Sequence, residues 1–357
     1  MGVFALVRKQ RRDPSRWAAE RRTAAAGLLL SGVLFLLPAL TLRDAPLYPD
    51  AGVDPLPPAG NAALEAEPAP EPLRSARDHG RPVRLQTAEG EVVELPMDEY
   101  LWGVVAAEMP ASFEEEALKA QACAARTYTA LAQNRGKKHP DADICAVSSC
   151  CQAYIERSAA EARWGLSAKE YAGKIQQAVE ETDSLGILYN GAPIQALFFS
   201  SAAGRTVDAV EVWGSAVDYL KSVDSPEGEE VPNYRTQVQL AAQEVRQLTL
   251  EAYPGADLSG APASWFGQAA RNEAGGVISI PLGGITLTGG QVRSLFSLRS
   301  ASFTVDWDGE QFTFDVTGYG HGVGMSQYGA NAMAKEGSTF REILTWYYTG
   351  AEVAPLW

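Results

Sequence analysis

The stretch SFEEEALKAQACAARTYTALAQ, residues 112–133, decides the central element of the fold. It is rich in alanine, which has the lowest free-energy cost of any residue in a helix interior, and it contains no glycine or proline. Ser112 and Glu115 have the spacing of a capping box, in which each side chain accepts a hydrogen bond from the other residue's backbone N–H. We therefore predict a helix over residues 113–133 that begins at this box.

The segment before this helix indicates a hairpin, a second helix and a sharp corner. The run VRLQTAEGEVVEL, residues 83–95, holds two alternating stretches around a glycine-containing turn, which is typical of a β-hairpin. A helix is expected over residues 98–107. It should stop at Met109, because a residue that precedes proline avoids the helical conformation. Glu108 is therefore expected at a corner between helix and loop.

The segments after residue 133 alternate irregularly between helix and strand. Ser167 and Glu170 form a second capping box, for a helix that should run to about residue 182. The run LGILYNGAPIQALFFS, residues 185–200, contains Asn190-Gly191, a strong signal of a type I′ hairpin. Further strands are predicted over 277–281, 302–307 and 311–317, and short helices over 241–252, 290–296 and 340–348. This order predicts an α+β fold rather than a wound parallel sheet.

The N-terminal part of the sequence has the pattern of a membrane anchor. Residues 1–22 carry seven basic and two acidic side chains, and residues 24–42 carry no charge. At ~1.5 Å per residue, a helix over this uncharged run can cross a hydrocarbon core of roughly 30 Å. The basic flank places the N-terminus in the cytoplasm. We expect a cytoplasmic tail over 1–22 and a transmembrane helix over 23–43, with a cleaved signal peptide as the alternative.

Residues 44–80 are predicted to form an extended spacer. Eight of the chain's 21 prolines fall between residues 44 and 72, together with alanines and scattered acids. Such a composition cannot bury enough apolar surface to fold by itself. We therefore expect a single-pass protein of the cell membrane whose folded domain, residues 81–357, is extracytoplasmic.

Composition and motifs exclude several classes of function. The 357 residues include 30 basic and 44 acidic side chains, a formal net charge of −14, which argues against nucleic-acid binding because such binding needs a basic surface. The sequence has no G-x-S-x-G, H-E-x-x-H or P-loop motif. The glycine-dense residues 318–324 lack the spacing of a dinucleotide-binding loop, so no organic cofactor is expected.

Two polar sites stand out. Glu108 lies between alanines and Met-Pro, a setting that raises the pKa of a carboxyl and suits it to general-acid catalysis; capping or pairing with a neighbour is the alternative. In GYGHGVGMSQYGANAMA, residues 318–334, glycine at every second position allows a ligand or another strand to come close. His321, Ser326 and Gln327 would give this stretch the polar lining of a groove, and a plain turn before a helix is the alternative.

Three of the four cysteines, Cys145, Cys150 and Cys151, fall within seven residues. In an oxidising compartment a disulfide is one interpretation, but it leaves an odd thiol. Three thiolates from one loop suit a tetrahedral Zn²⁺ better, with a water or a fourth side chain as the remaining ligand. Both interpretations stay open. Cys123, among the alanines of the predicted helix, is expected to be a small core residue.

Together these stretches resemble the stage II sporulation protein D family, which includes membrane-anchored peptidoglycan lytic transglycosylases of forespore engulfment and amidase-enhancer proteins. The resemblance spans about residues 83–353. Its motifs are YLWGVVAAEMP (100–110), EALKAQ (116–121), AARTY (124–128), FSSAAGRT (199–206), Tyr219-Leu, Arg299-Ser, GHGVGMSQYGA (320–330) and ILTWYYTG (343–350).

The resemblance implies a catalytic function for one residue and substrate binding for several. Glu108 becomes the catalytic acid of a glycan-binding groove, and the residues in or beside the groove are Arg126, Thr206, Tyr219 and His321. From the residues alone, an ordinary helix-surface arginine or a buried ion-pair arginine is the alternative for Arg126. Some members of the family bind zinc at the cysteine loop through a Cys, a His and a Cys. Cys150 replaces that histidine here, so a structural or groove-lining zinc is an expectation that this departure weakens.

The function that the resemblance implies is cleavage of the MurNAc–GlcNAc bond with formation of 1,6-anhydro-MurNAc, during septal and engulfment remodelling in sporulation. Expected partners are peptidoglycan glycan strands, a cell-wall amidase and other membrane proteins of an engulfment complex. A non-catalytic glycan-binding activator of an N-acetylmuramoyl-L-alanine amidase is one alternative. A hydrolase with Asp208 or Glu211 as a second carboxylate is another.

Overall fold

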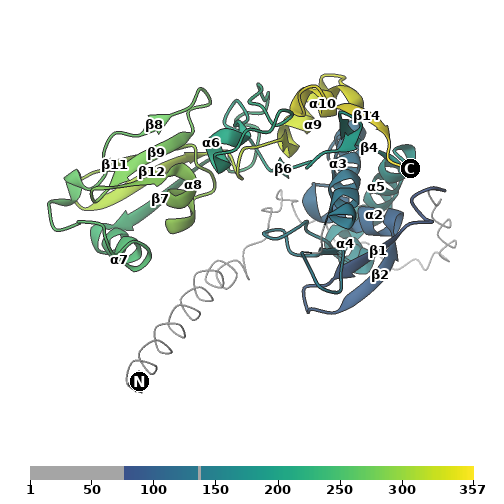
Figure 1. Ribbon diagram of the computed structural model, residues 1–357, viewed down its shortest axis with the longest axis horizontal. Helices are drawn as coiled ribbons and strands as arrows, with labels where there is room; N and C mark the ends of the chain where they lie inside the picture. The colour runs from purple at the N-terminus through teal and green to yellow at the C-terminus, as the bar shows by residue number, and fades with distance from the viewer. Residues whose placement is uncertain (1–75, 136–137) are drawn as a thin grey trace, which may run out of the picture. The chain divides into compact units, whose positions relative to one another are not determined.

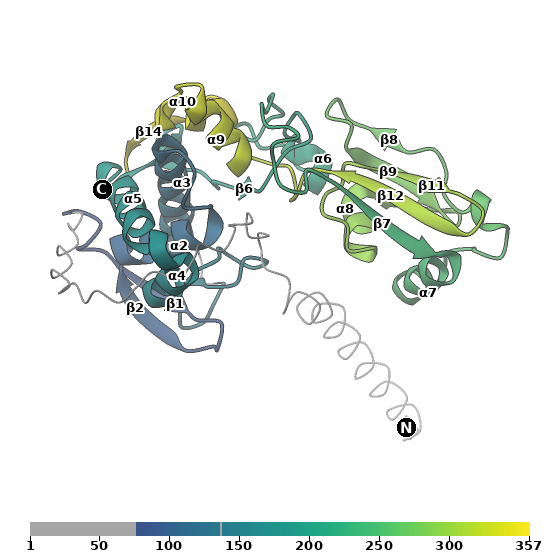
Figure 2. The same ribbon diagram turned by 180° about the vertical axis from the view of Figure 1, so that it is seen from behind.

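The computed structural model describes residues 76–135 and 138–357, and Figures 1 and 2 show them from opposite sides. Helices and short strands alternate along this part of the chain without a repeating unit. The predicted α+β class is confirmed. The buried hydrophobic residues form two separate clusters. We call them the first core and the second core.

Helix α3 (Glu115–Asn134) runs through the first core, beside α2 and α5 in both views (Figures 1 and 2). Its alanines are buried, and their small side chains let the neighbouring helices come close. The other elements around this core are β1 (Pro82–Gln86), β2 (Val92–Pro96), α2 (Met97–Glu108), β3 (Ile144–Cys145), α4 (Arg157–Trp164), η1 (Gly165–Ser167), α5 (Ala168–Glu181), β4 (Leu185–Tyr189), β5 (Ala192–Pro193), β6 (Phe198–Phe199), α6 (Ala209–Trp213), β13 (Met325–Ser326), α9 (Gln327–Lys335), α10 (Phe340–Tyr347) and β14 (Glu352–Pro355).

The start of α3 differs from the prediction. The helix begins at Glu115 and Glu114 is its N-cap, without a side-chain capping bond. Instead, the Glu114 N–H donates to Asn331 Oδ1 of α9 at 2.8 Å. The prediction of a capping box at Ser112 was therefore wrong. A hydrogen bond to Asn331, in a helix far along the chain, replaces the local cap.

Both predicted hairpins are present. Strands β1 and β2 pair antiparallel from Pro82↔Pro96 to Gln86↔Val92. Strands β4 and β5 join through Asn190 and Gly191, whose φ angles of 51° and 74° are those of a type I′ turn. The C-terminal strand β14 pairs with the other edge of β4.

The second core is built by the segment between about residues 235 and 317. Its central sheet has the order β11-β12-β7, and a second sheet has the order β10-β9-β8. The predicted strands and helices of this segment are confirmed, but β7, the partner of β12, was not predicted. The elements are β7 (Arg235–Ala241), α7 (Ala242–Ala252), η2 (Pro262–Ser264), β8 (Ala270–Arg271), β9 (Val277–Leu282), β10 (Ile285–Thr288), α8 (Gly289–Leu295), β11 (Phe303–Trp307) and β12 (Gln311–Thr317).

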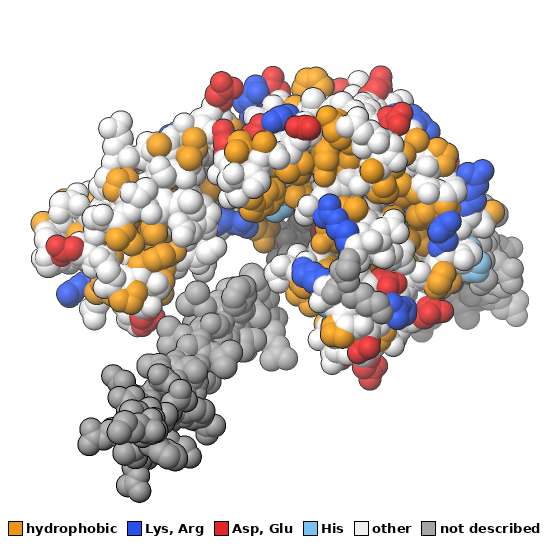
Figure 3. All heavy atoms as spheres, viewed as in Figure 1, with side chains coloured by type: hydrophobic (Ala, Val, Ile, Leu, Met, Phe, Trp, Pro, Cys, Tyr) orange, Lys and Arg blue, Asp and Glu red, His pale blue; other side chains and the backbone are white. Residues whose placement is uncertain are grey.

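The folded part begins earlier than the sequence predicted. Residues 76–80, assigned to the spacer, lie against the first core, and the Asp78 side chain is completely buried. The rest of the spacer, the basic tail and the predicted transmembrane helix lie outside the described residues. Within the described ranges, no helix combines the length and the apolar character that a bilayer crossing requires. On the face drawn in Figure 3, acidic and basic side chains are intermixed with hydrophobic ones.

Candidate functional site

Glu108 is the last residue of α2, at the corner that the sequence predicted. Met109, which follows it, has an extended backbone with φ −120° and ψ 146°, as expected of a residue before proline. Glu108 is partly exposed, whereas the residues of α2 before Ala107 are mostly buried. The end of the helix therefore presents one carboxyl from an otherwise apolar surface.

Two donors from distant segments hold this carboxyl. The Ala153 N–H donates to Glu108 Oε1 at 2.6 Å, and the Gln327 side chain donates a second hydrogen bond. Burial raises the pKa of Glu108 to about 7, while these two hydrogen bonds favour the ionised form and limit the rise. The carboxyl therefore changes its protonation state near neutral pH.

Gln327 is the first residue of α9 and is buried. Its Nε2 also lies 3.5 Å from Gln121 Oε1 of α3, so α3 and α9 together fix the side chain that contacts Glu108. The structure thus brings Gln327 and Glu108 together. Sequence reasoning missed Gln121, although it lies within the EALKAQ motif, because nothing local to that motif indicates its partner.

The glycine-rich stretch packs against another segment of the chain rather than forming an open loop. Gly318 and Gly324 have φ angles of 76° and 81°, and a Cβ atom on them would lie 2.6 Å from Ser201 O and 2.1 Å from Leu197 O, respectively. Ser326, beyond them, is buried: its hydroxyl caps α9 and donates to Glu227. The polar atoms of Ser326 are therefore used inside the protein, and its predicted place in a groove lining has no support from these contacts.

The His321 ring is held by hydrogen bonds within the protein and is not free to act as an acid or base. Its Nδ1 accepts a hydrogen bond from the Val323 N–H at 3.1 Å, and the ring also bonds to the backbone of Phe198. Burial lowers the pKa of His321 to about 4, with a further contribution from the positive charge of Arg293. The imidazole is therefore neutral at physiological pH, and both of its nitrogens have protein partners.

Arg126, expected in or beside the groove, is fully buried in the first core. Its guanidinium forms an ion pair with Asp78 at 2.7 Å and donates to the carbonyl oxygens of Leu185 and Val179 at 2.9 and 3.3 Å. With 0% exposure it has no surface for a substrate. These contacts correct the expectation of glycan binding, since Arg126 ties α3 to α5 and β4.

Thr206 and Tyr219 also bond within the protein. Thr206 is buried, and its hydroxyl accepts from the Val223 N–H at 2.9 Å. The Tyr219 hydroxyl accepts from the Gln195 N–H at 3.0 Å, and its ring lies 5.5 Å from that of Tyr189. Both residues therefore fix the loop over residues 195–223. Thr206 is buried and has no surface for a glycan, whereas Tyr219 is partly exposed.

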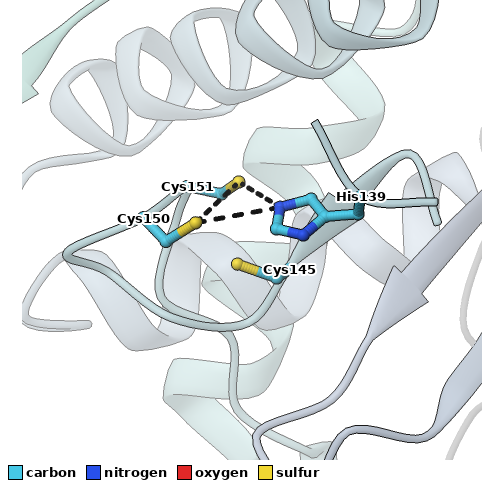
Figure 4. Close-up of side chains that lie close together, drawn as sticks. All are labelled: His139, Cys145, Cys150 and Cys151. Atoms are coloured by element: carbon cyan, nitrogen blue, oxygen red, sulfur yellow. Dashed lines mark hydrogen bonds between the residues drawn. The ribbon is translucent and has the colours of Figure 1, made fainter. Parts of the chain in front are cut away.

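The cysteine loop forms a four-ligand cluster (Figure 4). The ligand atoms of His139, Cys145, Cys150 and Cys151 all lie within 4.8 Å of one another. His139 Nε2 is 3.3 Å from Cys151 Sγ and 3.8 Å from Cys150 Sγ, and the two sulfurs are 3.9 Å apart. All four cysteines of the described residues are free thiols.

This donor set fits zinc. Tetrahedral Zn²⁺ with Zn–S bonds of ~2.3 Å places its sulfur ligands ~3.8 Å apart, close to the separation found here. His139 supplies the fourth side chain that the sequence left open. Its place six residues before Cys145 was the available signal, which the sequence analysis did not use.

The cluster and the Glu108 carboxyl are linked through the chain. Cys151 is followed directly by Gln152 and Ala153, whose N–H donates to Glu108. Gln152 is buried, and its Nε2 donates to the Tyr100 hydroxyl at 3.0 Å and to Thr129 Oγ1 at 3.1 Å. A group that holds the cysteine loop in place therefore also holds one donor of the Glu108 site.

Comparison with known proteins identifies the family. The family model described as "Stage II sporulation protein" matches residues 86–189. Stage II sporulation protein D of Bacillus subtilis (strain 168) is 39% identical over 272 residues, covering 75% of this chain and 77% of the relative. The chain belongs to the stage II sporulation protein D family.

Other relatives agree with this assignment. Stage II sporulation protein D of Bacillus amyloliquefaciens is 33% identical over 335 residues, which are 90% of this chain and 95% of the relative. A protein named "Amidase enhancer", from Bacillus subtilis (strain 168), is 29% identical over 308 residues, 70% of this chain but 39% of that protein. The range matched by the family model, residues 86–189, contains Glu108 and the whole cysteine cluster, while Gln327 lies outside it.

Proposed function

We propose that this protein is a lytic transglycosylase that cleaves the MurNAc–GlcNAc bond of peptidoglycan strands and leaves a 1,6-anhydro end. The observation that carries the proposal is Glu108, a partly exposed carboxyl whose pKa burial raises to about 7. A group with this pKa is partly protonated near neutral pH, so it can donate a proton and then accept one.

Glu108 performs both proton transfers. Its protonated carboxyl gives the proton to the glycosidic oxygen as the bond to the anomeric carbon breaks. The C6 hydroxyl of the same muramic acid forms the new bond to that carbon, and its proton passes to the Glu108 carboxylate. The acid is thereby regenerated, and no water is consumed. The Ala153 N–H stabilises the carboxylate between the two steps.

This reaction needs one carboxyl, whereas a hydrolytic glycosidase needs two. The two acids considered for a hydrolase are engaged elsewhere. Asp208 caps α6 and lies 3.5 Å from Lys221 Nζ, and Glu211 accepts from Asn272 Nδ2 at 2.7 Å. Their contacts support the single-carboxyl reaction over hydrolysis.

Membership of the family supports a function in cell-wall remodelling during sporulation, and we propose that the transglycosylase acts on septal and engulfment peptidoglycan. The predicted anchor over residues 23–43 would hold the domain on the outer side of the cell membrane, with a cytoplasmic N-terminus. A cell-wall amidase and other membrane proteins of an engulfment complex are the proposed partners. The relative named "Amidase enhancer" supports the first of them.

That relative also supports a second candidate function, in which this protein binds glycan and activates an amidase without cleaving the strand itself. The products distinguish the candidates. We expect the full chain, incubated with purified glycan strands, to release fragments with 1,6-anhydro ends, read by mass spectrometry. Reducing ends would indicate hydrolysis. Intact strands, both with and without stem peptides, would favour the amidase activator.

We further propose that His139, Cys145, Cys150 and Cys151 hold one Zn²⁺. The metal would supply a structural crosslink between the loop at His139 and the cysteine loop that leads to Ala153. Structural zinc sites with three or four thiolate ligands stabilise short loops that lack a hydrophobic core of their own.

The zinc proposal predicts about one zinc per chain in reduced protein. Cys151→Ser and His139→Ala should each lower zinc occupancy, because each removes a ligand. The matched controls are Cys123→Ala, a buried cysteine of α3, and His79→Ala, a histidine that lies beside Asp98. Elemental analysis of the purified proteins measures the occupancy. Zinc-free protein with a Cys145–Cys151 disulfide and a free Cys150 would contradict the proposal.

A further inference from the structure

A small cavity lies beside the glycine-rich stretch, away from the contacts of Glu108. It has a volume of about 100 Å³, and its lining includes Arg205, Glu211, Asn272, Arg293 and His321. By the measure in which one water needs ~10–15 Å³, this volume holds a small polar group and several waters. The lining combines two arginines with one acid, so its charge balance decides what it can bind.

Arg293 of α8 brings a positive charge that no carboxylate neutralises within the described ranges. Its Nε donates to Leu298 O at 3.3 Å, and it forms no ion pair with any described residue. Arg293 is partly buried, and this burial lowers the pKa of its guanidinium. A desolvated cation without a counter-ion is unusual in a folded protein and favours an anionic ligand.

Arg205 lines the same cavity and also has an unused N–H donor. Its Nη1 forms an ion pair with Asp224, but its Nε is buried and has no hydrogen-bond partner among the residues that the structure describes. Buried donors are almost always satisfied in native structures, by protein, water or ligand. Two guanidinium groups with unused N–H donors therefore line one small volume.

The other ionisable residues of the lining do not compensate the charge of Arg293. Glu211 accepts from Asn272 Nδ2 at 2.7 Å and forms no ion pair with either arginine. His321 is neutral, and both of its ring nitrogens bond within the protein. The unpaired positive charge of the lining is therefore that of Arg293, whose planar fork of donors matches a carboxylate.

We propose that this cavity is a subsite for a carboxylate carried by the peptidoglycan substrate, with Arg293 as its principal ligand. The inference rests on the proposed function, which supplies a polymer with two sources of that group. Muramic acid bears a free lactyl carboxylate where its stem peptide has been removed, and stem peptides bear carboxylates of their own. A charge-assisted, two-point bond from Arg293 is the interaction that either source would make.

Two further features place a glycan near this subsite. The Trp213 side chain is 50% exposed and its ring centroid lies 5.9 Å from that of His321, so an apolar platform for a sugar ring lies beside the cavity wall. The six residues from His321 to Gln327 span at most about 20 Å. Because Gln327 contacts Glu108, one strand of several sugars can reach both the carboxylate subsite and the catalytic acid.

The test measures binding in a full chain that carries Glu108→Gln and therefore does not cleave. Arg293→Gln and the control Arg246→Gln, an exposed arginine of α7, are each added to that chain. The probes are glycan strands freed of peptides, the same strands with their carboxyls converted to methylamides, and peptide-bearing strands. We expect Arg293→Gln to weaken binding of a carboxylate-bearing probe roughly 10- to 100-fold and Arg246→Gln to leave it unchanged.

The probes identify the source of the carboxylate. A loss with peptide-free strands points to the lactyl group, and a loss with peptide-bearing strands alone points to the stem. If the lactyl group is the ligand, blocked strands should bind the parent as weakly as free strands bind Arg293→Gln, with no further effect of the substitution. Equal binding of all carboxylate-bearing probes by the parent and Arg293→Gln would overturn the proposal. Equal binding of free and blocked strands by the parent would exclude the lactyl group, and the proposal would then require a loss with peptide-bearing strands.

Failure of the carboxylate subsite and failure of the proposed transglycosylase activity give different results. Absence of anhydro ends with the wild-type chain would remove the transglycosylase but would leave the binding result standing. Arg293→Lys keeps the positive charge but lacks the two parallel donors of the guanidinium. Its affinity for carboxylate-bearing strands should lie between those of the parent and Arg293→Gln. If Arg293→Gln fails to fold, binding of the free, blocked and peptide-bearing strands by the parent and by Arg293→Lys decides the question.

Discussion

Glu108→Gln is expected to lower the rate of glycan cleavage by roughly 10²–10⁴-fold while strand binding survives. The amide keeps the shape of the side chain and accepts the hydrogen bond from the Ala153 N–H, but it has no proton to transfer. Release of anhydro-ended fragments by wild type and variant, measured by mass spectrometry over time, gives the ratio. The control Glu115→Gln removes an exposed acid at the start of α3 and should retain the wild-type rate.

The pH profile follows from the same carboxyl. The first step needs the protonated acid, and the pKa of Glu108 is raised to about 7. The cleavage rate of the wild type should therefore fall as the pH rises through about 7. A profile without this decline, or undiminished cleavage by Glu108→Gln, would contradict Glu108 as the proton donor.

The stability of Glu108→Gln shows whether its activity is lost through the missing proton or through misfolding. Because the folded state raises the pKa of Glu108 from 4.5 to about 7, it binds the proton more tightly than the unfolded state does. The free energy of unfolding must then decrease as the pH rises between these values. By ~1.4 kcal/mol per pKa unit, Glu108→Gln should be more stable than wild type by about 3 kcal/mol above pH 7. An inactive but stabilised variant cannot be explained by misfolding.

The parts of the fold that could be predicted are those whose signals are local. The Asn190-Gly191 turn needs positive φ at both residues, which few other dipeptides accept, so its hairpin was evident from the sequence. The alanine-rich helix and the corner at Met109-Pro110 likewise depend on neighbours in the chain. Each of these elements formed as predicted, apart from the first turn of the alanine-rich helix.

The parts that were missed depend on distant partners. Strand β7 has its place because it pairs with β12, 70 to 82 residues later, from Arg235↔Thr317 to Ala241↔Gln311. The division into two cores follows from such pairings, and composition does not reveal it. The first turn of α3 shows the same effect, since its cap is Asn331 of α9.

The candidate site divides in the same way. The position of Glu108 at a helix corner and its apolar setting were predicted from adjacent residues. Its two donors, Ala153 and Gln327, come from segments whose approach only the fold reveals. His139 was missed as a cluster member for that reason too. Arg126 was placed near a groove by resemblance, whereas its contacts are those of a buried structural cation.

Asp78→Asn is expected to lower the free energy of unfolding by about 3–5 kcal/mol, because it leaves Arg126 as a buried charge without its partner. Both side chains of this ion pair have 0% exposure, so water cannot replace the lost carboxylate. Denaturant unfolding of the full chain at pH 7 measures the change. The control Glu229→Gln removes a partner of Arg235 in an exposed pair, with side chains 68% and 72% exposed, and should cost less than about 1 kcal/mol.

Shortening the chain tests the same contact and the boundary of the folded domain. A chain that begins at Pro82 lacks Asp78 and should be destabilised like Asp78→Asn, whereas a chain that begins at residue 76 keeps the ion pair. Equal stability of the two shortened chains would show that residues 76–81 contribute nothing to the fold, contrary to the buried position of Asp78.

The double replacement Asp78→Leu with Arg126→Met decides between a structural and a substrate-binding Arg126. Removing both charges together avoids an unpaired buried ion, so the double variant should recover part of the stability lost in Asp78→Asn. Recovery stays incomplete because the carbonyls of Val179 and Leu185 lose their donor. Where the double variant is folded, it should bind glycan as wild type does, since Arg126 is fully buried. A folded double variant that no longer binds glycan would instead indicate that Arg126 contributes to the glycan-binding groove.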